Sequence, residues 1–134
     1  MASLVIMVMS GPDDGQEIHL SREHNNGEAN ADGSWTVWFG RREECDISIP
    51  FDTQVSRRHA TLRVTPEGEF WLRDEQSLNG TFVEKERIGA ATQVRRGQLF
   101  RLGRTWLRIQ AAYDLAQAMK HANRIHVRRI WRAA

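Results

Sequence analysis

Apolar and polar residues alternate along most of this chain, and turn residues interrupt the alternation roughly every 8–12 positions. The runs that indicate strands are Leu4–Met9, Glu17–Leu20, Trp35–Phe39, Ile47–Ile49, Ala60–Val64, Phe70–Leu72, Thr81–Val83, Gln93–Val94, Leu99–Leu102 and Trp106–Ile109. Many short strands at this spacing are typical of a β-sandwich or a β-barrel. The sequence therefore predicts an all-β fold.

Large side chains on these strands are candidates for the core. One strand places three of them on a single face, namely Trp35, Val37 and Phe39. We also expect Trp38, Trp71 and Trp106 to pack in the core, because burial of an indole ring removes much apolar area from water. The segment 21–34 is rich in Asn, Glu, Gly and Asp, so we predict an exposed and mobile loop there.

The end of the chain follows a different pattern. Asp114 is a suitable N-cap with Gln117 three positions later. The apolar residues that then share one helical face are Leu115, Ala118, Met119, Ala122 and Ile125. The pattern predicts a helix from about Leu115 to about Val127. We therefore divide the chain into a sandwich domain, residues 1–112, and a helical basic tail, residues 113–134.

The charge of the chain is concentrated in this tail. The net charge of the 134 residues is +2, and five Lys or Arg with no acidic residue lie between Lys120 and Arg132. A balance this mild does not indicate nucleic acid by itself. Three interpretations of the tail stay open: packing on the sandwich, docking of a partner or second copy, and contact with an acidic membrane or nucleic acid. We expect packing for its first turns.

The single cysteine, Cys45, excludes an internal disulfide and fits a reducing compartment. No apolar run approaches the roughly 20 residues of a membrane span, and the first nine residues do not resemble a signal peptide. We therefore expect a cytoplasmic protein. Cys45 has no zinc-type spacing to His19 or His24, so we expect neither a metal nor a cofactor.

Three short motifs carry candidate chemistry, and they read Gly40-Arg41, Ser56-Arg57-Arg58-His59 and Ser77-Leu78-Asn79-Gly80-Thr81. Each falls on a predicted loop, where rigid strands commonly display binding groups. Arginine matches a phosphate with a planar, permanently charged fork, and a serine hydroxyl adds one donor. An asparagine amide both donates and accepts, so it suits the main chain of a bound peptide.

Ser56 and His59 could also be a nucleophile and its base. Such a pair needs an orienting acid and an oxyanion hole, and no strand–elbow–helix pattern surrounds Ser56. We therefore do not expect an enzyme.

These motifs, in this order, resemble those of the forkhead-associated (FHA) domain, a phosphothreonine-peptide-binding module. Asp46-Ile47 and the stretch Gln98–Gly103 agree with the same pattern, so the resemblance covers roughly Leu4 to Gln110. It implies a twisted β-sandwich of two mainly antiparallel sheets, with the peptide held by loops at one end. It also implies that the partner is a protein or peptide that contains phosphothreonine, such as a Ser/Thr kinase or the substrate of one.

The resemblance implies a role for each matching residue. Arg41 corresponds to the phosphate clamp, Ser56 to the hydroxyl donor, and Arg57 to an additional phosphate contact. Asn79 corresponds to the residue that binds the peptide main chain beside the phosphothreonine. Leu78, the neighbouring position of the phosphopeptide site, would contact the phosphate only through its backbone. The residues that shape these loops in the family correspond to Gly40, His59, Gly80 and Thr81.

Two departures from the family pattern leave alternatives open. Leu78 stands where several members have a threonine that touches the phosphate, and Glu84-Lys85 stands where a turn usually reads Asn-Gly. The chain could therefore be a phospho-independent assembly module that uses the sandwich surface and the tail. A nucleic-acid binder that works through the basic tail is a third alternative.

Overall fold

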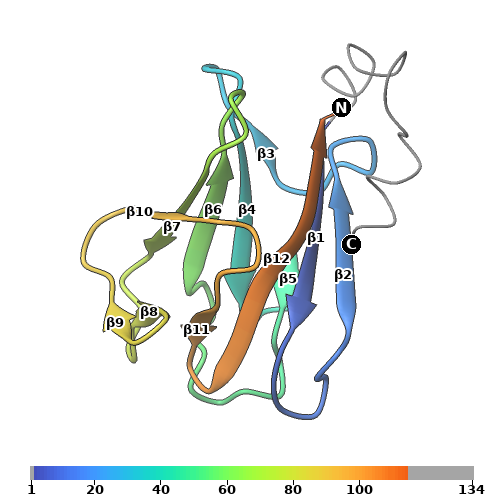
Figure 1. The fold of residues 1–134 in the computed structure, drawn as a ribbon. Coiled ribbons are helices and arrows are strands. Elements are labelled where there is room, and N and C mark those ends of the chain that lie inside the picture. The colour runs from blue at the N-terminus through green and yellow to red at the C-terminus, as the bar shows by residue number, and fades with distance from the viewer. Residues whose placement is uncertain (1, 115–134) are drawn as a thin grey trace.

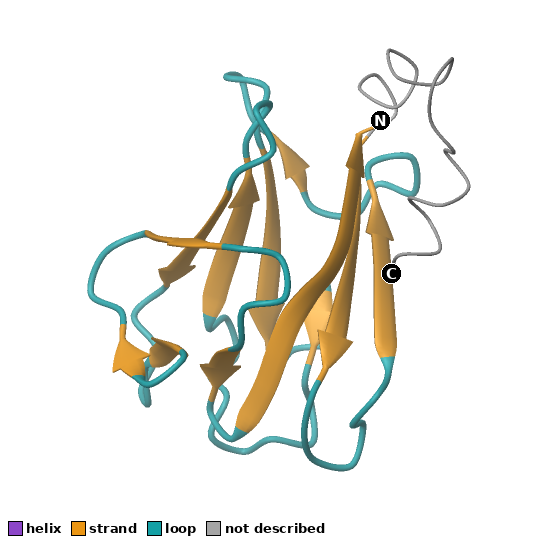
Figure 2. Cartoon of the chain, viewed as in Figure 1, coloured by secondary structure: helices purple, strands orange, loops and turns teal. Residues whose placement is uncertain are grey.

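The computed structural model describes residues 2–114, and every regular element among them is a β-strand (Figure 2). The helix predicted from about Leu115 to about Val127 lies outside the described residues. The last strand continues to Asp114, which is beyond the end at residue 112 that we predicted for the sandwich domain.

Two sheets pack face to face (Figure 1). The first sheet contains, in spatial order, β2 (Glu17–Ser21), β1 (Ala2–Val8), β12 (Thr105–Asp114), β11 (Phe100–Leu102), β8 (Thr81–Val83) and β9 (Glu86–Arg87). The second contains, in spatial order, β10 (Thr92–Val94), β7 (Phe70–Asp74), β6 (Ala60–Val64), β4 (Trp35–Gly40) and β3 (Glu28–Ala29), with β5 (Ile47–Ser48) paired to β4. The β4–β5 pair is parallel and the other strand pairs are antiparallel, which confirms the predicted mainly antiparallel sandwich.

Each predicted strand is present, and two further strands were missed. Both β3 and β9 are two residues long and exposed, so they are too short to show an apolar alternation. β9 completes a hairpin with β8, and Glu84 in its turn has a φ of 54°. The turn at Glu84-Lys85 thus adopts left-handed backbone without the usual glycine.

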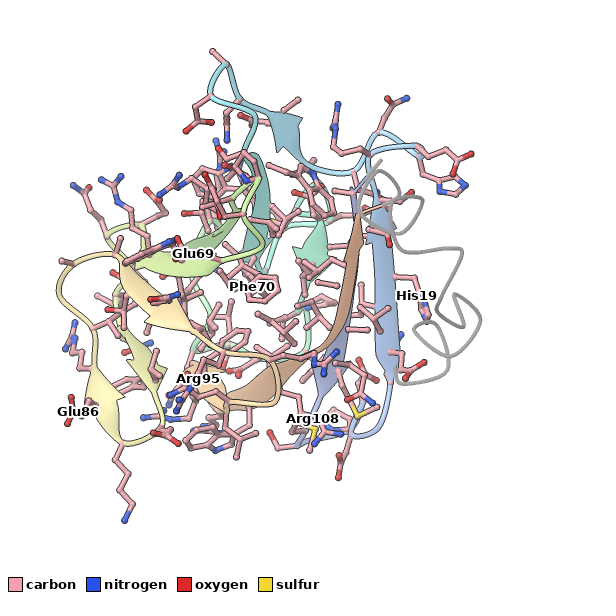
Figure 3. All side chains as sticks on the ribbon, turned by 45° about the horizontal axis from the view of Figure 1, so that its top comes forward. His19, Glu69, Phe70, Glu86, Arg95 and Arg108 are labelled. Carbon is pink, nitrogen blue, oxygen red and sulfur yellow. The ribbon has the colours of Figure 1, made fainter. Side chains whose placement is uncertain are left out.

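The core lies between the sheets, where alternate residues of each strand point inward. Phe39 and Phe100 join the two sheets in an edge-to-face contact with ring centroids 5.7 Å apart. Phe70 also points into this layer (Figure 3). Among residues 2–114, Trp35 is the tryptophan that lies in the core, with 3% of its surface exposed.

Our prediction that Trp38, Trp71 and Trp106 pack in the core is wrong. All three are only partly buried, because each alternates along its strand with residues that face the core. Arginines cover two of these rings on the outer faces. The Cζ atom of Arg58 lies 3.9 Å from the ring centroid of Trp38, and that of Arg101 lies 5.6 Å from the Trp106 ring.

The segment 21–34 is mostly exposed, as predicted, but it is also tied to the sheet. It contains β3, which pairs with β4, and the backbone N–H of Gly27 donates to Asp46 at 2.8 Å. Among residues 2–114 we find no helix suited to cross a bilayer and no group of three potential metal ligands.

Candidate functional site

The first motif lies where β4 ends, at the lower end of the sandwich in Figure 1. The backbone N–H of Arg41 donates to the Ser56 carbonyl at 3.0 Å, so the first two motifs are in direct contact. A Cβ at Gly40 would lie 2.1 Å from the Arg57 carbonyl oxygen and 2.7 Å from the Cys45 sulfur. Position 40 therefore has room only for glycine, which gives a steric reason for the glycine that precedes Arg41.

His59 connects the second motif to the third. Its side chain is fully buried, its Nδ1 accepts the Ser56 backbone N–H at 3.0 Å, and its Nε2 donates to the Gly80 carbonyl at 2.9 Å. Burial lowers the pKa of His59, so the neutral imidazole that fits these two bonds is favoured. Because Nδ1 is occupied by an amide, it is not the base for the Ser56 hydroxyl.

The Ser56 hydroxyl instead reaches the third motif. Its oxygen accepts the backbone N–H of Leu78 at 3.1 Å. A hydroxyl that accepts through a lone pair still has its proton to donate. Ser56 thus keeps a donor for a ligand while it fixes the neighbouring loop.

Asp74 stabilises the inside of the third motif. Its carboxylate accepts the hydroxyl and backbone N–H of Ser77 and, at 2.7 Å, the Thr81 hydroxyl. The Ser77 oxygen in turn accepts the Gly80 backbone N–H at 2.9 Å. Gly80 has a φ of +87°, which an L side chain rarely adopts. This network fixes the turn that presents Leu78 and Asn79.

Asn79 ties the same turn to the segment just before the second motif. Its Nδ2 donates to the Gln54 carbonyl at 2.9 Å, which leaves its amide oxygen and second N–H for a ligand. The Leu78 side chain on this turn is 85% exposed.

These hydrogen bonds bring the predicted residues of all three motifs together at one end of the sandwich.

Two of the predicted cations are exposed. Within residues 2–114, the side chains of Arg41 and Arg57 form neither a hydrogen bond nor an ion pair with the protein. Their charges are thus available to an anion from solvent. The adjacent groove, of about 370 Å³, is lined by Arg42 and Arg58 rather than by Arg41 or Ser56.

Cys45 lies beneath the first two motifs. Its thiol donates to the Arg57 carbonyl at 3.3 Å, and burial raises its pKa. A protonated thiol is a weak nucleophile, which indicates a packing role.

Two carboxylates that hold this end together, Asp52 and Asp74, were not predicted from the sequence. Asp52 is 5% exposed and accepts the backbone N–H of Gln54 at 3.0 Å. It also accepts the backbone N–H of Arg104 and the hydroxyl of Thr105, each at 2.7 Å. The bond from Asp52 to Gln54 is a local turn that the sequence could have suggested. The bonds to residues 104 and 105 had no such signal.

Comparisons with known proteins point to one family. The family model for the FHA domain matches residues 37–103. An oxoglutarate dehydrogenase inhibitor of Corynebacterium efficiens is 38% identical over 84 residues, which are 63% of this chain and 49% of that protein. The chain thus spans about half the length of the curated relatives it matches.

Solved structures show the same fold. The FHA domain of CT664 from Chlamydia trachomatis superposes with a TM-score of 0.64 at 24% identity, over 84% of this chain and 97% of that one. An FHA structure from work on phosphothreonine-dependent interactions has a TM-score of 0.61 at 26% identity, over 80% of this chain and 94% of the other.

Proposed function

This chain belongs to the FHA family, and from that premise we propose that it is a non-enzymatic recognition module for phosphothreonine-containing protein segments produced by Ser/Thr kinases. The observation that carries the proposal is the direct bonding of three loops around Ser56. Arg41 is bonded to its carbonyl, Leu78 to its hydroxyl, and its own N–H to a buried histidine.

The residues at this end suit a phosphomonoester. Such a group carries nearly two negative charges and three strong acceptor oxygens. Arg41 and Arg57 supply charge without a competing carboxylate partner among the described residues, and Ser56 supplies a neutral donor. An Asp or Glu side chain has one charge and two oxygens, so it would satisfy fewer of these groups. Asn79 would hold the main chain of the bound segment.

Calorimetric titration of a phosphothreonine peptide and its unphosphorylated twin tests the proposal. We expect Arg41→Ala to abolish measurable binding, because it removes the main charge-assisted hydrogen bonds to the phosphate. Its thermal unfolding should match that of wild type, since the Arg41 side chain is exposed. Arg96→Ala is the matched control, because Arg96 lies beside Ala2 and Gly68 at the opposite end. Equal affinity of wild type and Arg41→Ala would contradict the site.

The exposure of Leu78 favours a second candidate, a phospho-independent assembly module. A leucine that is 85% exposed on a fixed loop is suited to an apolar contact with a protein surface. Capture of one stable partner before and after phosphatase treatment separates the two functions. Retention after treatment favours assembly, and loss favours phosphothreonine recognition.

What the whole protein regulates is a separate proposal. The Corynebacterium relative is named as an inhibitor of oxoglutarate dehydrogenase, and this chain matches about half of it. We infer that this domain supplies the recognition of a phosphorylated partner within kinase signalling. A cytoplasmic location stays a prediction from the sequence.

A further inference from the structure

Arg87, which belongs to none of the three motifs, lies beside the loop that carries Leu78 and Asn79. It is on β9, where it pairs with Phe82 of β8, and the next residue, Ile88, donates its N–H to the Thr81 carbonyl at 2.9 Å. The β8–β9 hairpin therefore continues directly from the third motif (Figure 1). The turn of this hairpin, Glu84-Lys85, departs from the family pattern, and the sequence predicted no role for it.

The guanidinium of Arg87 lies against Gly80. An ideal Cβ built on Gly80 would be 2.7 Å from Nε, 2.9 Å from Cζ and 3.2 Å from a terminal nitrogen of Arg87. The absence of a side chain at Gly80 leaves the room for this close approach. Asn79 directly precedes Gly80 in the chain, so a cation lies beside the residue expected to hold the peptide.

This guanidinium has spare capacity for a ligand. Arg87 is exposed, and within residues 2–114 it forms no hydrogen bond or ion pair. Its neighbour Glu86 points to the other face of β9, because successive strand residues alternate. Glu86 lies at the outside of the hairpin in Figure 3.

The position of Arg87 relative to the phosphate donors indicates what it would bind. Leu78 contacts the Ser56 hydroxyl through its N–H, and Gly80 is two residues further along. Two residues of chain span at most about 7 Å. A group that reaches Arg87 would therefore belong to a residue within about three positions of the phosphothreonine.

We propose that Arg87 is a specificity-determining residue that selects an anionic side chain close to the phosphothreonine of the bound segment. The inference rests on the proposed function and adds the class of partner. A planar guanidinium recognises a carboxylate and a second phosphate by the same paired donors. A carboxylate and a second phosphate would both supply the anion that Arg87 binds, and the experiment below distinguishes between them.

The test uses fluorescence anisotropy with a phosphothreonine peptide of otherwise neutral sequence. Alanine, glutamate or a second phosphothreonine is placed at each of three positions on either side. We expect wild type to bind one of the anionic series about five- to tenfold more tightly than the alanine peptide. Arg87→Gln should reduce this preference to within twofold, and should change the affinity for the alanine peptide by less than twofold.

Arg96→Gln is the control, since it removes the same charge far from the loops; it should keep the full preference. Arg87→Lys should keep part of the preference, because it retains the charge but not the fork. If glutamate and phosphothreonine raise the affinity equally, the preferred partner is an acidic segment. If phosphothreonine raises it more, the preferred partner is a doubly phosphorylated segment.

The inference is overturned if wild type shows no anionic preference, or if Arg87→Gln weakens all peptides equally, as a purely structural residue would. In either case the proposed function stands, provided that Arg41→Ala still abolishes binding. Absence of binding to every phosphopeptide would contradict both proposals.

Discussion

The two ends of the sandwich are held together in different ways. At the end that carries the motifs, hydrogen bonds join loops that are distant in sequence, such as Ser56 to Leu78 and Asp52 to Thr105. At the other end the turns bond mainly within themselves, as in Asn30 to Ser34 and Thr65 to Glu69. Cross-linked loops are ordered before a ligand arrives, so less conformational entropy is lost on binding. The difference fits the recognition site that we propose at the cross-linked end.

The largest expected effect comes from adding one methyl group at each end. We expect Gly40→Ala to lower the free energy of unfolding by about 3 kcal/mol and to abolish peptide binding, because its Cβ would overlap the Arg57 carbonyl. Gly68→Ala meets no atom within 4 Å and suffers only from its φ of +86°, so we expect about 1 kcal/mol and unchanged affinity. Urea unfolding and calorimetry measure both quantities. Similar losses in the two variants would show that the ends are equally tolerant.

A smaller effect is expected from neutralising a carboxylate at each end. Asp52→Asn replaces a buried acceptor of three hydrogen bonds with an amide, so we expect a loss of about 2 kcal/mol. Asp32→Asn changes an exposed acceptor of Ser34, and we expect less than about 0.5 kcal/mol. The midpoints of urea unfolding measure both losses, provided that the two variants and wild type unfold with the same dependence on urea concentration. An Asp52→Asn variant as stable as wild type would refute the importance of this cross-link.

The smallest expected effect is a pH dependence from His59. Burial lowers its pKa below the ordinary 6.5, although the Gly80 carbonyl and Asp74 act to raise it. The unfolded chain therefore binds the proton more readily, so the stabilisation is complete above pH 6.5 and is lost as the pH falls below that value. Urea unfolding between pH 7.5 and 5.5 should show this loss in wild type and in the exposed control His19→Gln. His59→Gln should show a flatter profile, and an unchanged slope would remove His59 as the cause.

Alternation and motifs were sufficient to predict the sandwich and to select residues that meet at one end. Alternation works because half-buried strands need one apolar face, and the motifs work because each loop carries its own polar groups. The faces of the tryptophans were mispredicted because size suggests burial, whereas strand position decides it. Trp38 alternates with the buried residues Val37 and Phe39 and is covered by Arg58 instead.

The remaining features depend on contacts between distant parts of the chain. Asp52 bonds to residues 52 and 53 positions away, and no local pattern specifies which carboxylate will do so. Arg87 contacts Gly80 only because the hairpin of β8 and β9 folds back on the third motif. Such contacts follow from the assembled sheets, so they had to be observed in the structure.

The pairing of Ala2 with Asp114 has a practical consequence for anyone who attaches this domain to something else. The two outermost described residues are neighbours across adjacent strands, at the upper end of the sandwich in Figure 1 and away from the loop that begins at Arg41. Attachment of a reporter, a surface tether or a host protein at these residues would leave the end that carries the three motifs accessible. The domain could also be inserted into a loop of a host protein, because its two attachment points would enter and leave side by side.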